Sequence, residues 1–97
     1  MSEEIIDLEV YARDGKTPPH GKKYQIRVDN VRIIVYTATP TGREILTKAN
    51  KFPIERFQLN QKLRGGVVRK IDYDETVDLT KPGIERFMTV PLDQTEG

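Results

Sequence analysis

Apolar and polar residues alternate near the middle of the chain, and this pattern predicts a β-hairpin. Between residues 23 and 28 every second side chain is apolar, which is typical of a strand with one buried face. A run of mostly β-branched residues follows at 31–36, and Asp29 and Asn30 separate the two runs. Both residues tolerate the left-handed backbone of a tight turn. The pattern therefore predicts two antiparallel strands joined by a two-residue turn.

One amphipathic helix is predicted at residues 41–50. Thr41 is a good N-cap residue, and Glu44 three positions later completes a capping box, in which each side chain bonds the backbone N–H of the other residue. A single apolar stripe runs along this helix, formed by Ile45, Leu46 and Ala49. Asn50 and Pro53 are typical of a helix end. We expect the apolar stripe to pack on a sheet.

Further strands are predicted after the helix. Short apolar runs indicate them at residues 57–63, 67–71 and 84–90. Gly65 and Gly66 lie between the first two runs, where a turn needs the positive φ that glycine adopts easily. A polar connector at 74–79 carries two apolar anchors, Val77 and Leu79. Hairpin, helix and further strands predict an α+β fold in which a mixed sheet of four or five strands wraps around one helix.

A short amphipathic helix is predicted near the start of the chain, at residues 3–13. Acidic residues begin it, and an apolar stripe recurs every three positions, at Ile5, Leu8 and Tyr11. A helix of this length is marginal alone in water, so the stripe must pack on its own domain or on a second molecule. The elements from residue 22 onward contain enough apolar residues for a core. We therefore expect Ile5, Leu8 and Tyr11 to form an oligomer contact, and docking on the same chain is the alternative.

Composition and charge narrow the classes of function. The 97-residue chain has a formal net charge of +1, whereas nucleic-acid binding usually shows as a strong basic excess. It contains no cysteine, and its only histidine, His20, lies in a linker rich in proline and glycine. The carboxylates do not occur with a nucleophile or at metal-ligand spacing, so we predict no catalytic residue, metal or cofactor. The first residues have the pattern of neither a signal peptide nor a membrane span, and we expect a cytoplasmic protein that binds no membrane.

Specific strings in the sequence resemble the bacterial multiubiquitin-type ubiquitin-like proteins. These strings are YARDGKTPP before the first strand, TGREIL in the helix, KLRGG at a turn, and DETVDLTKPGIERFMTVP near the end. The resemblance covers residues 7–91 and implies a ubiquitin-like β-grasp fold. We place that domain at 22–91, with an N-terminal amphipathic segment and linker at 1–21 and a flexible tail at 92–97.

The resemblance implies a protein modifier rather than an enzyme. Such modifiers are encoded with an activating enzyme, a conjugating enzyme and a deconjugating peptidase, and some of these operons are linked to anti-phage defence. The carboxylate of Gly97 would be adenylated, passed to a thiol and joined to an amine of a target protein. A final glycine lets the backbone approach closely because it has no Cβ. The chain departs from the family by ending in Glu96-Gly97 instead of Gly-Gly, and by having one domain where members often have several in tandem.

Two other functions are compatible with the same sequence. A sulfur carrier shares the fold and the adenylated glycine, although such carriers usually end in Gly-Gly. A non-covalent adaptor domain would instead oligomerise through the N-terminal segment. Genes for conjugating enzymes beside this one would favour the modifier, whereas genes of a cofactor pathway would favour the carrier.

Partners of β-grasp modifiers usually bind the exposed face of the sheet, and we expect that face around the hairpin of the third and fourth strands. The predicted partner-binding residues are Leu59, Gln61, Leu63, Val68 and Lys70. The alternative is that Leu59 and Leu63 fill the core, because a one-residue error in register exchanges the two faces of a strand.

Overall fold

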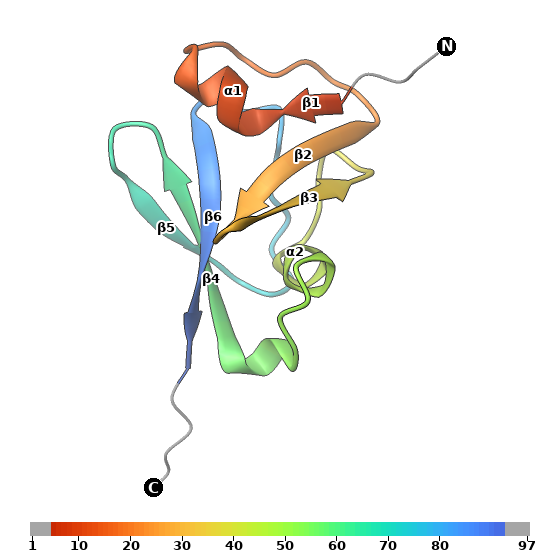
Figure 1. Cartoon of the computed structure of the whole chain (residues 1–97), viewed down its shortest axis with the longest axis vertical. Coiled ribbons are helices and arrows are strands. Elements are labelled where there is room, and N and C mark those ends of the chain that lie inside the picture. Colours follow the sequence, from red (N-terminus) through yellow and green to blue (C-terminus); the bar gives the residue numbers. More distant parts are fainter. Residues whose placement is uncertain (1–4, 93–97) are drawn as a thin grey trace, which may run out of the picture.

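Within residues 5–92, which the computed structural model describes, six strands form one sheet against a main helix (Figure 1). The strands are β1 (Ile5–Asp7), β2 (Lys23–Val28), β3 (Val31–Val35), β4 (Phe57–Leu63), β5 (Val68–Ile71) and β6 (Ile84–Pro91). The helical elements are α1 (Leu8–Arg13), α2 (Gly42–Lys48) and the 3-10 turn η1 (Ile54–Arg56). The predicted α+β fold is confirmed, and the sheet has one strand more than expected because β1 is present.

The sheet is mixed, and β6 lies in its middle. β2 pairs antiparallel with β3 along its length, so β1 and β6, which both run parallel to β2, share its other edge. β4 runs antiparallel to both β6 and β5. The hairpin turn falls at Asp29, whose φ is 54°, and the second turn at Gly65 and Gly66, whose φ values are 92° and 88°. Both predicted turns are confirmed, and β1, β3 and β5 each pair with one neighbouring strand and lie at edges of the sheet.

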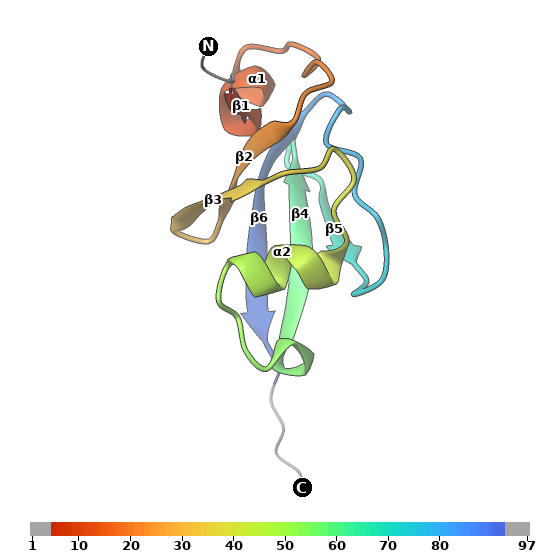
Figure 2. The same ribbon diagram turned by 90° about the vertical axis from the view of Figure 1, so that its right-hand side faces the viewer.

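Helix α2 begins and packs as the sequence predicts. Thr41 Oγ1 accepts from the backbone N–H of Glu44 at 3.1 Å, and Glu44 Oε1 accepts from the backbone N–H of Thr41 at 2.8 Å. Ile45 and Leu46 are fully buried in the core. The helix crosses one face of the sheet (Figure 2). Its end is marked by the left-handed backbone of Asn50, whose φ is 62°.

The N-terminal segment differs from its prediction, because residues 3–13 do not form one continuous helix. Ile5–Asp7 form β1 beside β2, and α1 starts only at Leu8, where Asp7 Oδ1 caps the backbone N–H of Glu9 at 3.1 Å. β6 pairs with β2 at Val28 alone, so the N-terminal half of that edge of β2 is open to β1. Figures 1 and 2 show β1 and α1 together at the end of the sheet.

The apolar residues of this segment belong to the core of the same chain. Ile6, Leu8 and Ala12 are buried, and Tyr11 packs against the core. They are therefore not surplus to the fold, contrary to the expectation from composition. The linker is fixed as well: Tyr24 Oη donates to the carbonyl of Pro19 at 2.9 Å and accepts from the N–H of Gly21 at 2.8 Å.

The connector between β5 and β6 is attached to the segment before α2. Val77 and Leu79 are buried, as predicted, and their backbone N–H groups donate to the carbonyls of Pro40 and Ala38, both at 2.8 Å. These bonds hold the connector against the segment that precedes α2. No helix between residues 5 and 92 is long and apolar enough to cross a membrane.

Candidate partner-binding face and C-terminal tail

Strand β6 leads directly to the predicted conjugation site. It ends at Pro91, at the end of the molecule opposite α1 (Figure 1). The backbone N–H of Leu92 then donates to the carbonyl of Arg56 at 2.7 Å, so the chain is held by η1 up to this residue. Leu92 is the first residue of the predicted tail, and residues 93–97, with Gly97, lie outside the described residues. The described part of the chain therefore ends at Leu92, at the end of the molecule opposite α1.

The pairing of β4 with β5 separates the five predicted partner-binding residues onto different faces. Leu59 is fully buried and pairs with buried Ile71, and Gln61 is only 6% exposed. Their assignment to the exposed face is wrong, because β4 has the alternative register in which these positions point inward. Leu63 follows on the same side and is half-buried. Val68, which is 53% exposed, and Lys70 do lie on the outside.

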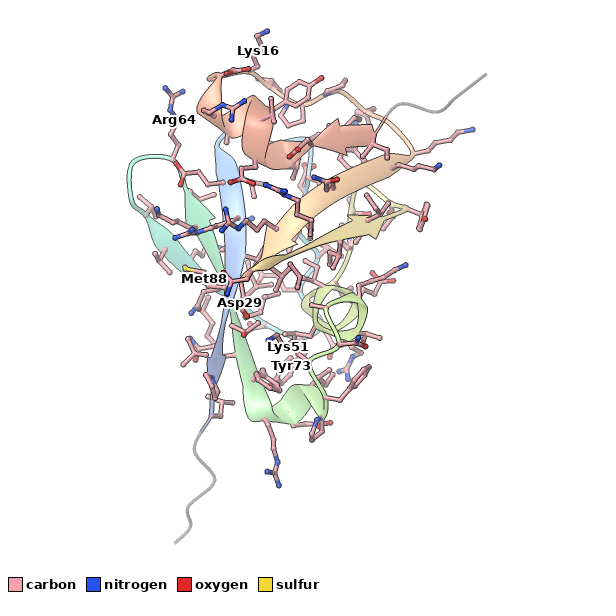
Figure 3. All side chains as sticks on the ribbon, viewed as in Figure 1. Lys16, Asp29, Lys51, Arg64, Tyr73 and Met88 are labelled. Atoms are coloured by element: carbon pink, nitrogen blue, oxygen red, sulfur yellow. The ribbon has the colours of Figure 1, made fainter. Side chains whose placement is uncertain are left out.

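The opposite faces of β4, β5 and β6 form the actual exposed surface, which we call the outer sheet face. Directly paired residues share a face, and Asn60 is opposite both Lys70 on β5 and Met88 on β6. The same logic extends along the strands, so that the outer sheet face consists of Gln58, Asn60, Lys62, Val68, Lys70, Arg86, Met88 and Val90. Figure 3 labels Met88 near its centre.

The residues from β6 were missed by sequence reasoning although a signal was present. Phe87 is fully buried, so its neighbours Arg86 and Met88 must face outward in a strand. The run Ile84–Pro91 reads as mostly apolar, which hides this alternation. A register shift between Lys62 and Leu63 also changes the pairing at the start of β6, and that shift has no local signature in the sequence.

The outer sheet face combines a small apolar centre with basic surroundings. Val68, Met88 and Val90 supply apolar surface, and Val90 is 44% exposed. The basic residues are Lys62, Lys70 and Arg86. Lys62 pairs with Glu85 at 3.4 Å, whereas Arg86 Nε is buried without a hydrogen-bond partner among the described residues. An apolar centre with a charged rim is the usual composition of a surface that binds another protein.

A carboxylate on the β2–β3 turn holds β6 in place. Asp29 Oδ1 accepts from the backbone N–H of Thr89 at 2.9 Å, Oδ2 accepts from the Thr89 hydroxyl, and Lys51 Nζ lies 3.3 Å from Oδ2 (Figure 3). Partial burial raises the pKa of Asp29, but the hydrogen bonds from Thr89 and the nearby Lys51 together outweigh it and hold this pKa below its ordinary value. The strand that carries the tail is thus anchored by an ionised side chain.

The predicted oligomer contact residues are also separated by the fold. Leu8 is 2% exposed and Tyr11 is half-buried against the core of the same chain, so both dock in cis. Ile5 is 48% exposed on the outer side of β1. Contact with a second molecule stays a prediction, and Ile5 is the member of the three that is accessible for it.

Comparison with known proteins adds one finding. The model of the family described as multiubiquitin matches residues 24–91, which include β3, α2, β4 to β6 and all of β2 except its first residue. Comparisons with curated proteins and with solved structures gave no match. The match spans most of the chain and coincides with a mixed sheet around one main helix, as in a ubiquitin-like fold. The chain therefore belongs to the multiubiquitin family of ubiquitin-like proteins.

Proposed function

We propose that this protein is a modifier that is attached to amines of other proteins through the carboxylate of Gly97. The observation that carries the proposal is the family match, which ends at residue 91, where β6 ends and the predicted tail begins. The backbone is held up to Leu92, which lies at the end of the molecule opposite α1. A tail that starts at this end is suited to enter the active site of another enzyme.

The chemistry needs only the terminal carboxylate from this chain. The carboxylate attacks the α-phosphate of ATP in an activating enzyme, which releases pyrophosphate and leaves an acyl adenylate. A thiolate of that enzyme or of a conjugating enzyme displaces AMP to give a thioester. A target amine then displaces the thiolate, loses a proton and forms an amide bond. A deconjugating peptidase would reverse the attachment by hydrolysis of that bond, and a role in anti-phage defence is one prediction for the pathway.

The outer sheet face is the surface that we assign to these enzymes. Its apolar centre at Met88 and its basic residues lie on β4, β5 and β6, and β6 continues into the tail. An enzyme that binds this face is therefore positioned by the same strand that delivers the carboxylate. Leu63, which is half-buried at the end of β4, lies on the other side of the sheet and is not part of this surface.

The test is conjugation with the cognate activating and conjugating enzymes, followed by intact mass and gel analysis. The wild-type chain should form adducts, and deletion of Gly97 should abolish them, whereas Gln94→Ala in the same tail should conjugate normally. Met88→Glu should slow conjugation because it places a charge in the apolar centre of the outer sheet face. Undiminished adduct formation by the deletion variant would refute the proposal. A terminal thiocarboxylate in place of protein adducts would favour the sulfur carrier.

A further inference from the structure

A hollow of about 550 Å³ lies on the side of the sheet opposite the outer sheet face. It is bounded by the inner side of β4, by β5 and by the connector that leads to β6. Its floor is apolar, formed by Leu63, Val77 and Ile84. Its size falls within the range of ligand pockets, roughly 300–1,000 Å³. The modifier chemistry proposed for Gly97 does not use this hollow.

One polar side chain in the hollow has no partner. Gln61 is 6% exposed, lines the hollow, and its amide makes no hydrogen bond with another described residue. Its neighbours on the same face of β4, Leu59 and Leu63, are apolar. Arg86 Nε is the buried side-chain polar atom without a partner among the described residues, so the amide of Gln61 keeps its contact with solvent through the hollow. A group that enters the hollow can therefore replace water as the hydrogen-bond partner of this amide.

The charges at the rim of the hollow balance one another. Arg69 pairs with Glu75. The hydrogen bond from the backbone N–H of Asp72 lowers the pKa of Glu75 most, and the side chain of Arg69 lowers it further, so both members of the pair are ionised. Asp78 and Lys81 add one further charge of each sign. A rim of two cations and two anions does not favour a charged ligand of either sign. It favours a neutral group that both donates and accepts hydrogen bonds.

We propose that this hollow binds a side-chain amide of a partner peptide, with Gln61 as the residue that recognises it. A glutamine amide in the ligand offers one donor group and one acceptor, which complement the acceptor and donors of Gln61 in a paired arrangement. The methylenes of the same ligand residue cover the apolar floor at Val77 and Ile84. The connector, which closes one side of the hollow, is held by backbone bonds to Pro40 and Ala38, so the site is formed before the ligand arrives.

The test is a titration of the full 97-residue chain, labelled with ¹⁵N, with the peptide acetyl-Ala-Ala-Gln-Ala-Ala-N-methylamide. The same peptide with Leu or Glu in place of Gln serves as the matched control ligand. We expect shifts of the Gln61 side-chain amide and of the backbone amides of Arg69, Thr76 and Lys81, with a Kd on the order of millimolar. The Leu and Glu peptides should bind about tenfold more weakly, the effect of the lost hydrogen bonds.

Two variants decide whether Gln61 is responsible. Gln61→Met keeps the size of the side chain and removes the amide, so it should weaken binding of the Gln peptide about tenfold, and urea denaturation should show that the variant is folded. Asn60→Ala, on the outer sheet face, should bind the peptide normally. Absence of shifts, shifts centred on the outer sheet face, equal binding of the three peptides, or normal binding by Gln61→Met would each overturn the proposal. The titration does not involve Gly97, so it succeeds or fails independently of conjugation.

Discussion

Replacing Asp29 by asparagine should loosen the attachment of the β2–β3 turn to β6. Both carboxylate oxygens of Asp29 accept hydrogen bonds from Thr89, and Lys51 Nζ lies 3.3 Å away. Asparagine has nearly the same size and tolerates the φ of 54° at this position. The change therefore removes the charge and one acceptor and leaves the backbone of the turn intact.

The expected cost is about 2 kcal/mol of the free energy of unfolding. A hydrogen bond to a charged group contributes roughly 1.5–3 kcal/mol, and asparagine can keep only one of the two bonds to Thr89. The ion pair with Lys51 adds at most about 1 kcal/mol, because both side chains retain some contact with water. The total stability of a domain of this size is roughly 5–15 kcal/mol, so a loss of this size is readily measured.

The effect should depend on pH in a defined direction. The pKa of Asp29 is lower in the folded chain than its ordinary value of 3.8. A carboxyl group with a lowered pKa contributes stability that is complete above its unfolded pKa and is lost as the pH falls through its folded pKa. The difference between the wild type and Asp29→Asn should therefore be constant near neutral pH and should shrink below about pH 4.

Urea denaturation followed by circular dichroism, at neutral pH and at several values below pH 4, measures this difference. Asp74→Asn is the matched control, because Asp74 pairs with Arg43 but its side chain is 84% exposed, and its effect should stay within about 0.5 kcal/mol. Thr89→Val added to Asp29→Asn should cost less than the sum of the two changes, since they share the same bonds. Equal stability of Asp29→Asn and wild type at neutral pH, or a difference that grows on acidification, would refute the reasoning.

Two further changes test the core and the helix start by the same denaturation assay. Thr41→Ala removes the hydroxyl that caps α2 and should cost about 1 kcal/mol, and an unchanged midpoint would contradict the capping role. Leu8→Ala should cost roughly 2–5 kcal/mol because Leu8 is buried in the core, whereas Ile5→Ala on the exposed side of β1 should change stability by less than about 1 kcal/mol. A small effect of Leu8→Ala would instead favour a segment that docks on a second molecule.

The hairpin and helix α2 could be predicted because their signals are local. Alternation in residues 23–28 fixes the buried face of β2, and the turn at Asp29 follows from residues that tolerate a positive φ. The capping box of Thr41 and Glu44 spans only one helical turn. In each case the interactions that decide the structure lie within a few residues of one another.

The errors arise where distant parts of the chain decide the structure. Ile5 and Leu8 fit helical spacing, but residues 5–7 become a strand because the edge of β2 is open beside them. Likewise, the sequence of β4 is compatible with either face inward, and its register is fixed by Ile71 and Phe87 on neighbouring strands. Gln61 was especially misleading, since a polar residue in an alternating strand is expected to face water.

The edge of β2 that pairs with β1 also decides how far the domain extends toward the N-terminus. The family match begins at residue 24, yet the core shared by those residues includes Ile6 and Leu8. Without β1, the N-terminal half of β2 would present unpaired backbone groups at a sheet edge, which is a template for association with another chain. β1 supplies those bonds from within the chain, and the Tyr24 hydroxyl holds the linker that returns from it. The structural unit of the described chain is thus longer than the matched region, because the segment before it completes both the sheet and the core.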